Sequence, residues 1–227
     1  MIKDYSKYTY NIPNPSFEKG TILKKLNKFI WDTLIIFQNE FKGYQKTSED
    51  VLSEHLSKTF DFYSKQLPFI FIREAAQRQT KGQNRKVDIG VFQHYAEQTP
   101  FFVIEAKRLP TLPKRREKEY VIGDKPSKPS GGIERFKSNI HGTNLSESAM
   151  IGYVQSGDLK KWIDEINNWI ETLIKESNNF DLQWTMDDLL NNECGFKKEE
   201  ITLFTSENKK MNNTSIKLYH YLIDMNK

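Results

Sequence analysis

The stretch VDIGVFQHYAEQTPFFVIEAKR, residues 87–108, predicts two neighbouring strands that carry charged residues at defined positions. In its first half, apolar residues alternate with Asp88, and its second half begins with a run that is apolar on both faces, as in a strand inside a sheet. Glu105 and Lys107 are two residues apart, so their side chains project from the same face of that strand. The stretch therefore predicts two acids and one lysine close together on adjacent strands.

These charges indicate a particular chemistry. Charged side chains on largely buried strands are costly to desolvate unless they serve one another or a ligand. A divalent cation such as Mg²⁺ is one such ligand, because it prefers carboxylate and carbonyl oxygens, here those of Asp88, Glu105 and the Ala106 backbone. Beside a metal, Lys107 would hold an attacking water and stabilise the negative charge that develops at phosphorus. The expected reaction is metal-dependent hydrolysis of phosphodiester bonds.

A helix is predicted just before the strands, in TSEDVLSEHLSKTFDFYSK, residues 47–65. Thr47 or Ser48 can cap its first turn. Helical steps of about 100° place Glu49 near the apolar stripe and Glu54 away from it. The expected buried stripe consists of Leu52, Leu56, Thr59 and Tyr63.

The rest of the chain indicates an α/β sheet with helices packed on it. Further helices are expected at 21–43, 133–142, 157–176 and 185–192, and further strands at 69–77, 149–155, 199–206 and 215–224, the last two as a hairpin. Residues 1–20 contain two prolines and are expected to be irregular. Residues 110–132, with four prolines, three glycines and a basic cluster, are expected to form a long surface loop.

The pattern formed by Asp88 and Glu105-Ala106-Lys107 resembles the bipartite motif of the PD-(D/E)XK nuclease superfamily, which includes many restriction endonucleases. Val87 stands where the family usually has proline, at a position that varies within it. The resemblance implies a restriction-endonuclease-like core, with the order helix, three strands, helix, strand over residues 47–155, and a C-terminal β-hairpin as an addition.

The resemblance also implies a site and a substrate. Mg²⁺ or Mn²⁺ would be bound by Asp88 and Glu105, with Lys107 positioning the water. In many members an acid of the first helix assists, which favours Glu49 here by its facing, with Glu54 as the alternative. The implied activity is that of a DNA endonuclease in bacterial restriction or anti-phage defence, although the motif does not distinguish DNA from RNA.

Positive residues near the motif are candidates for contact with the nucleic-acid backbone, because Lys and Arg neutralise phosphates. The alternative, ordinary solvated surface charge, stays open for them. The candidates are Arg108, Lys114, Arg115, Arg116, Arg135 and Lys137.

Composition narrows the class of protein. The 227 residues, 37% of them hydrophobic, are expected to form one domain, with a helical extension over 1–46, a catalytic core over 47–155 and a C-terminal helix and strands over 156–227. No apolar run approaches the roughly 20 residues of a membrane-spanning helix. The polar N-terminus lacks a signal-peptide pattern, and the single cysteine excludes an intrachain disulfide. A cytoplasmic protein without a membrane partner is expected.

The chain lacks other recognised catalytic motifs. The four histidines lack metal-ligand spacing and there is no Walker A loop, so ATP-driven action would need a separate subunit. The resemblance suggests a homodimer, or an ATPase, sensor or methyltransferase partner subunit. Two other functions stay open: a non-catalytic nucleic-acid-binding module, and a protein-interaction subunit of a larger complex that keeps the nuclease fold.

Overall fold

The computed structural model describes residues 19–43, 47–77, 85–93, 99–125, 129–176, 182–198 and 200–226. The strands in these residues are β1 Phe69–Gln77, β2 Arg85–Gln93, β3 Phe102–Leu109, β4 Glu147–Val154, β5 Asn192–Lys198, β6 Ile201–Lys209 and β7 Ser215–Asp224. The α-helices are α1 Lys19–Phe41, α2 Glu49–Tyr63, α3 Gly132–Lys137 and α4 Leu159–Lys175, and the 3-10 segments are η1 Lys114–Tyr120 and η3 Met186–Asp188.

The described strands form one mixed, seven-stranded sheet in the order β1-β2-β3-β4-β7-β6-β5. β1, β2 and β3 form the expected antiparallel meander. β3, β4 and β7 run parallel to one another, and β6 and β5 complete the sheet in antiparallel pairs. The α/β class is therefore confirmed, and residues 47–154 contain the expected order of helix, three strands, helix and strand.

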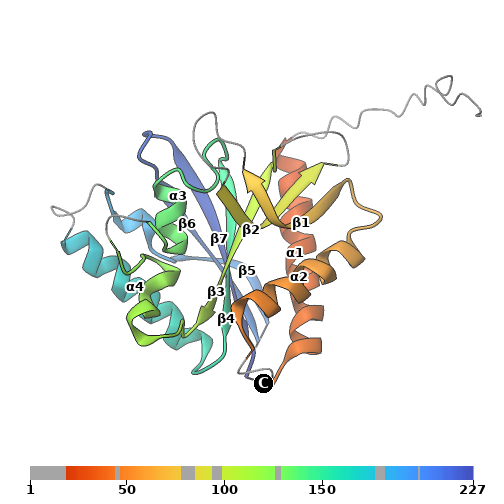
Figure 1. The fold of residues 1–227 in the computed structure, drawn as a ribbon, viewed down its shortest axis with the longest axis horizontal. Coiled ribbons are helices and arrows are strands. Elements are labelled where there is room, and N and C mark those ends of the chain that lie inside the picture. Colours follow the sequence, from red (N-terminus) through yellow and green to blue (C-terminus); the bar gives the residue numbers. More distant parts are fainter. Residues whose placement is uncertain are drawn as a thin grey trace, which may run out of the picture.

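Helices cover both faces of the sheet (Figure 1). α1 and α2 pack on one face, over a core that includes Leu26, Leu34, Leu56 and Phe102. α3, α4 and η1 lie on the other face, where the expected apolar side of α4 is buried. The side chains of α4 that are buried against the sheet are those of Trp162, Ile166, Trp169, Ile170 and Leu173. Side-chain alternation along each strand thus supplies two separate cores from one sheet.

The sequence correctly predicts α2 but not all of its buried face. Ser48 caps the helix, accepting a hydrogen bond from the Val51 amide. Leu52, Leu56 and Thr59 are buried as expected, but Tyr63 is exposed, and Phe60 is fully buried instead. Tyr63 is the last residue of α2, and its side chain lines a surface cavity.

Three other expectations need correction. Residues 110–132 are not a surface loop throughout, because η1 lies within them and buries Tyr120. The helix expected at 185–192 is reduced to the 3-10 segment η3, and an additional strand, β5, begins at Asn192. The β6–β7 hairpin is present, but it is no peripheral addition, since β7 pairs with β4 along its length inside the sheet. The irregular segment expected at 1–20 falls almost wholly outside the described residues.

Among the described helices, none combines the length and apolar character needed to cross a bilayer.

A buried hydrogen-bonded chain joins η1 to β6 and β7. His220 Nδ1 lies 3.1 Å from the Tyr120 hydroxyl oxygen, and His220 Nε2 lies 2.8 Å from Ser206 Oγ. Burial lowers the pKa of His220 to about 3, so the ring is neutral in the folded protein at neutral pH. Its contribution to stability therefore depends on pH.

We expect the free energy of unfolding to fall as the pH is lowered from about 6.5 toward about 3. In that window the unfolded chain binds a proton at His220, from its ordinary pKa of 6.5, whereas the folded chain does not until about 3. The loss from this one group is on the order of 4 kcal/mol. Urea unfolding at a series of pH values measures it. His220→Gln should show a smaller fall across the window, while the control His55→Gln, on α2, should keep the wild-type slope; an unchanged slope in His220→Gln would contradict the assignment.

Candidate active site

The candidate site forms where β2 separates from β3. The two strands pair through Val91–Phe102, Gly90–Val103 and Ile89–Ile104, and no pair between their described residues continues beyond Ile104. The edge of β3 facing β2 therefore has backbone groups that need other partners. The Ala106 amide donates to Asp88 Oδ2 at 2.7 Å, and the Arg108 amide donates to Glu49 Oε2 at 2.9 Å. Two carboxylates thus satisfy the opened edge of the strand.

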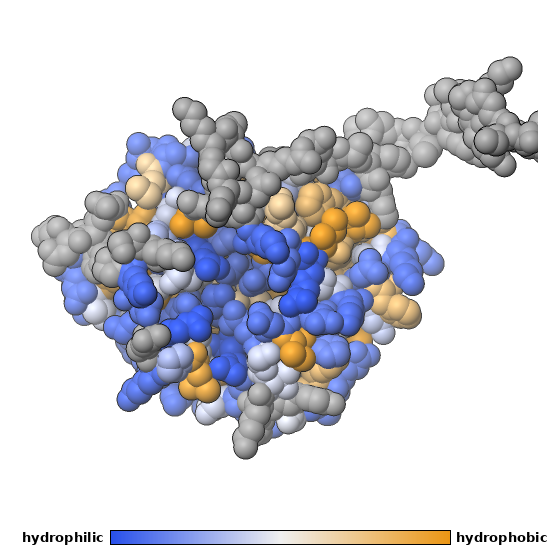
Figure 2. Space-filling model, in the orientation of Figure 1, coloured by the Kyte–Doolittle hydropathy of each residue, from blue (hydrophilic) through white to orange (hydrophobic). Residues whose placement is uncertain are grey.

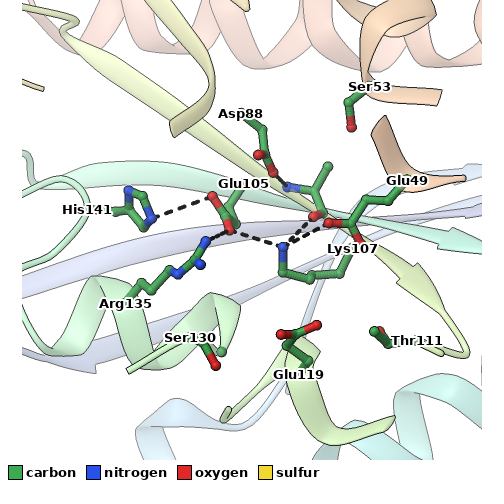
Figure 3. Close-up of polar contacts among 12 residues, drawn as sticks. Glu49, Ser53, Asp88, Glu105, Lys107, Thr111, Glu119, Ser130, Arg135 and His141 are labelled. Atoms are coloured by element: carbon green, nitrogen blue, oxygen red, sulfur yellow. Dashed lines mark hydrogen bonds and ion pairs between the residues drawn. The ribbon is translucent and has the colours of Figure 1, made fainter. Parts of the chain in front are cut away.

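Lys107 lies at the centre of this arrangement (Figure 3). Its Nζ donates to Glu49 Oε1 at 3.1 Å and to the Ala106 carbonyl oxygen at 2.9 Å, and it lies 3.1 Å from Glu105 Oε1. The side chains of Lys107 and Glu105 are 6% and 1% exposed. Glu105 and Lys107 therefore share one face of β3 as the sequence predicts, and three oxygens from two elements surround the ammonium group.

The position of Glu49 follows from the start of α2. Ser48 caps the helix and Glu49 is its first residue, which carries the carboxylate to the open edge of β3. Glu54 points elsewhere, forming ion pairs with Lys58 and Arg73. The choice of Glu49 over Glu54 by helical facing is thus matched by the contacts in the structure.

Arg135 of α3 reaches the same acid from the other side of the site. Its Nη1 lies 2.5 Å from Glu105 Oε1, and its side chain is 29% exposed. The helix that carries it is fixed by Glu134, whose Oε2 accepts hydrogen bonds from the amides of Gly123, Ser130 and Gly131. A Cβ at Gly131 would collide with the Ile122 backbone, so the loop can pack closely against the start of α3 only with glycine there.

The charges in the site perturb one another strongly. Burial opposes ionisation of Glu105, but Lys107, His141 and Arg135 outweigh it and hold the pKa of this carboxyl at about 2. Burial, followed by the negative charge of Glu105, raises the pKa of Asp88 to about 7. Burial acts to lower the pKa of Lys107, but Glu105, Glu49 and Asp88 outweigh it and raise the pKa above its usual value. The site therefore contains an ionised Lys107–Glu105 pair beside Asp88, whose nearby positive charge does not offset its burial and the charge of Glu105.

His141 is a site residue that the sequence prediction missed. It is buried, and its Nε2 lies 3.7 Å from Glu105 Oε2, on the side of the carboxylate away from Lys107 (Figure 3). The prediction considered only metal-ligand spacing among the histidines and found none. In the structure His141 follows Arg135 on the same short helix–turn segment and both converge on Glu105, which no spacing in the sequence indicates.

The donor set fits a hard divalent cation. Three carboxylates, of Glu49, Asp88 and Glu105, and the Ala106 carbonyl gather at the open edge of β3. Glu105 Oε2 is buried and has no hydrogen-bond partner among the described residues, with His141 Nε2 3.7 Å away, so this oxygen has a lone pair that a cation can use. Within those residues no three acid, histidine or cysteine side chains already stand at metal-binding distances from one another. Asp88 and Glu105 are the residues that would hold the ion.

The six predicted nucleic-acid contacts occupy different environments. Arg108 is partly exposed, Lys114 is exposed, and Arg116 is paired with Glu119 at 2.5 Å. The backbone of Arg115 is in η1, and its side chain lies outside the described residues. Arg135 pairs with Glu105, as described above.

The expectation for Lys137 is wrong. Its side chain is completely buried, 2.5 Å from the equally buried Asp188, and its Nζ lies 4.7 Å from the centre of the Trp184 ring. A lysine in this position cannot contact a nucleic-acid backbone. It instead ties α3 to η3, which helps to hold the helix that presents Arg135.

A surface cavity of about 350 Å³ lies away from these residues, between α1 and α2. It is lined by Glu40, Phe41, His55, Lys58, Thr59, Phe62 and Tyr63. None of these side chains takes part in the hydrogen bonds around Lys107, so the cavity is not part of the candidate site.

Comparisons of the chain with protein-family models, curated proteins and solved structures found no match.

The electrostatics of Asp88 predict a trade-off between stability and function. Because the folded state raises the pKa of Asp88 from 3.8 to about 7, the contribution of Asp88 to stability is greatest below pH 3.8 and is lost as the pH rises through 7. Asp88→Asn removes this loss and keeps an oxygen that can accept the Ala106 amide. We expect its free energy of unfolding at pH 8, without divalent metal, to rise by about 1–3 kcal/mol. Denaturant unfolding measures the change, with Asp61→Asn, an exposed acid on α2, as the matched control. A less stable Asp88→Asn would contradict the electrostatic account.

Proposed function

We propose that this protein is a metal-dependent nuclease with a restriction-endonuclease-like core, hydrolysing phosphodiester bonds of DNA. One observation carries the proposal. At the point where β2 leaves β3, the Lys107 ammonium lies within 3.1 Å of oxygens from Glu49, Glu105 and Ala106, and Asp88 caps the adjacent amide of the same strand edge. This is the acid, acid and lysine set that the sequence motif predicts, brought together by strands and a helix far apart in the chain.

Each residue has a distinct task in this proposal. Lys107 is held as an ammonium, so it donates hydrogen bonds to a water or to the phosphate and stabilises the negative charge of the transition state. Glu49 orients Lys107 by accepting from its Nζ at 3.1 Å. Asp88 and Glu105 are the residues that would hold Mg²⁺ or Mn²⁺, and the bound ion would supply Lewis-acid polarisation of the phosphate and an activated water.

The surface supports a polar substrate. Hydrophilic side chains gather over the middle of the face shown in Figure 2, between α1 and α2 on one side and α3 and α4 on the other. The larger apolar patches of that face lie nearer its edges. Lys114 and Lys118 of η1 are exposed, and neutralising phosphates with such residues is the main source of sequence-independent affinity for a charged polymer.

The biological setting is a separate part of the proposal. A role in restriction or anti-phage defence, assembly as a homodimer, and an ATPase, sensor or methyltransferase partner rest on the motif resemblance alone. RNA in place of DNA, and binding without cleavage, are outcomes that the first experiment below separates from the proposal.

Lys107→Ala should abolish most of the activity. Purified protein is incubated with plasmid DNA and Mg²⁺ or Mn²⁺, and nicking or linearisation is followed over time. We expect the variant to lose about 100- to 1000-fold in rate, because it removes a charge-stabilising donor from the transition state. Chelation of the metal should stop cleavage by the wild type.

The matched control is Lys160→Ala, which removes an exposed lysine of α4 that pairs with Asp164. It should cleave at the wild-type rate. If the wild type leaves plasmid and single-stranded RNA intact with either metal, yet binds DNA equally with and without metal, the protein is a binding module and the proposed activity is wrong.

The basic side of η1 should contribute to DNA affinity without sequence preference. Lys114 and Lys118 are exposed there, and each is expected to neutralise one backbone phosphate. The double variant Lys114→Ala/Lys118→Ala should therefore flatten the slope of log affinity against log salt concentration by about 2. Fluorescence anisotropy over a salt series measures this slope. The double variant Lys24→Ala/Lys28→Ala, on exposed positions of α1, should keep the wild-type slope, and an equal slope in both variants would exclude η1 from the interface.

A further inference from the structure

We propose that Arg135 is a displaceable counter-ion of Glu105, which leaves the acid for a substrate phosphate and thereby makes metal affinity depend on bound nucleic acid. This inference rests on the proposed function and concerns the regulation of the same site. It differs from the expectation that Arg135 simply holds the nucleic-acid backbone, because it gives the residue two alternating partners.

Arg135 and Lys107 compete for one oxygen atom of Glu105. Arg135 Nη1 and Lys107 Nζ lie 2.5 Å and 3.1 Å from the same atom, Glu105 Oε1. A divalent cation bound to Glu105 would lie close to both positive groups. At least one of them must then move away or reduce the affinity of the site for metal.

Burial and the number of partners determine which of the two cations can move. Lys107 is 6% exposed and is held by Glu49 and the Ala106 carbonyl as well as by Glu105. Arg135 is 29% exposed, and Glu105 is the acid with which it forms an ion pair among the described residues. Arg135 is therefore the group that can turn toward solvent without breaking the rest of the network.

The position of α3 does not depend on the ion pair between Arg135 and Glu105. α3 is anchored by Glu134, which binds three loop amides, and by the buried pair of Lys137 with Asp188. Both anchors lie next to Arg135 in the chain and neither uses its side chain. Breaking the Arg135–Glu105 pair thus leaves α3 in place, so the guanidinium can change partner locally.

The net charge of the site changes when Arg135 leaves it. In the arrangement observed, the carboxylates of Glu49, Asp88 and Glu105 face Lys107 and Arg135, and His141 lies beside the far oxygen of Glu105. Removing Arg135 leaves a more negative site, which attracts a divalent cation more strongly. A phosphodiester near Glu105 offers the guanidinium a second anionic partner with the geometry for paired hydrogen bonds. Substrate binding therefore frees Glu105 and raises the affinity for metal.

Metal binding without nucleic acid tests the competition directly. Mn²⁺ is titrated into the full-length protein and followed by electron paramagnetic resonance. We expect Arg135→Gln to bind Mn²⁺ about tenfold more tightly than the wild type, because one positive charge is removed beside the cation. Arg135→Ala carries the same expectation and serves as a second variant, and circular dichroism confirms that each is folded.

Two matched variants separate this effect from general electrostatics. Arg73→Gln removes a guanidinium that pairs with Glu54, not with Glu105, and should leave the Mn²⁺ affinity within about twofold of wild type. Arg135→Lys keeps a positive charge at the position and should also stay close to the wild-type affinity. If Arg135→Gln and Arg135→Ala bind Mn²⁺ no more tightly than wild type, the proposal is overturned.

The coupling is tested by repeating the titration with a saturating short DNA duplex, with readings taken before cleavage is detectable on a gel. The duplex should raise the Mn²⁺ affinity of the wild type about tenfold, and that of Arg135→Gln by less than about twofold. Because the coupling is reciprocal, Mn²⁺ should raise the affinity of each protein for the duplex by the same factor. Equal coupling in both proteins overturns the proposal while plasmid cleavage by the wild type leaves the nuclease function standing. A wild type that neither binds Mn²⁺ nor cleaves overturns both.

Discussion

The separation of β2 from β3 beyond Ile104 is the constraint on which the candidate site depends. Ladder pairing there would satisfy the amides of Ala106 and Arg108 with backbone carbonyls and would leave no room for side chains. Because the strands diverge, carboxylates of Asp88 and Glu49 take the two amides instead. The Ala106 carbonyl, on the same edge, is then available to the Lys107 ammonium. The break in the β2–β3 ladder thus brings two acids and a lysine together, and the amides of Ala106 and Arg108 remain hydrogen-bonded.

Burying several carboxylates together lowers the stability of the folded protein, and a bound cation would offset part of this cost. Burial and the Glu105 charge raise the pKa of Asp88 to about 7, while Glu105 Oε2 has no hydrogen-bond partner among the described residues. A core optimised for stability alone would replace such groups with apolar side chains. The surrounding structure offsets the cost through the two apolar layers on either side of the sheet. Buried carboxylates whose pKa values are shifted in opposite directions at one place are typical of a functional site.

The sequence predicts those parts of the site that follow from short-range geometry. A period of two puts Glu105 and Lys107 on one face, and a step of about 100° selects Glu49 over Glu54. It does not predict that Arg135 binds Glu105, because that contact joins residues 30 apart through a segment with no regular period. The error at Lys137 was avoidable. Two residues apart on a helix, Arg135 and Lys137 must project in nearly opposite directions, so they could not both face a substrate. The buried Tyr120 of η1 and the strand β5 were missed because prolines, glycine and charged residues there obscure the apolar pattern.

The two cations of the site also differ in kind, and the difference matches their surroundings. A compact ammonium can be enclosed by oxygens from several directions, as Lys107 is by Glu49, Glu105 and the Ala106 carbonyl. A planar guanidinium presents its donors as a fork that suits carboxylate and phosphate alike, and it remains charged in either setting. Arg135, partly exposed and reaching in from a separately anchored helix, has the freedom to use that dual preference. If the two residues were exchanged, a buried guanidinium could not be satisfied by three converging oxygens, and an exposed ammonium would lack the fork that matches phosphate. The position of each residue type therefore favours a fixed Lys107 and a mobile Arg135.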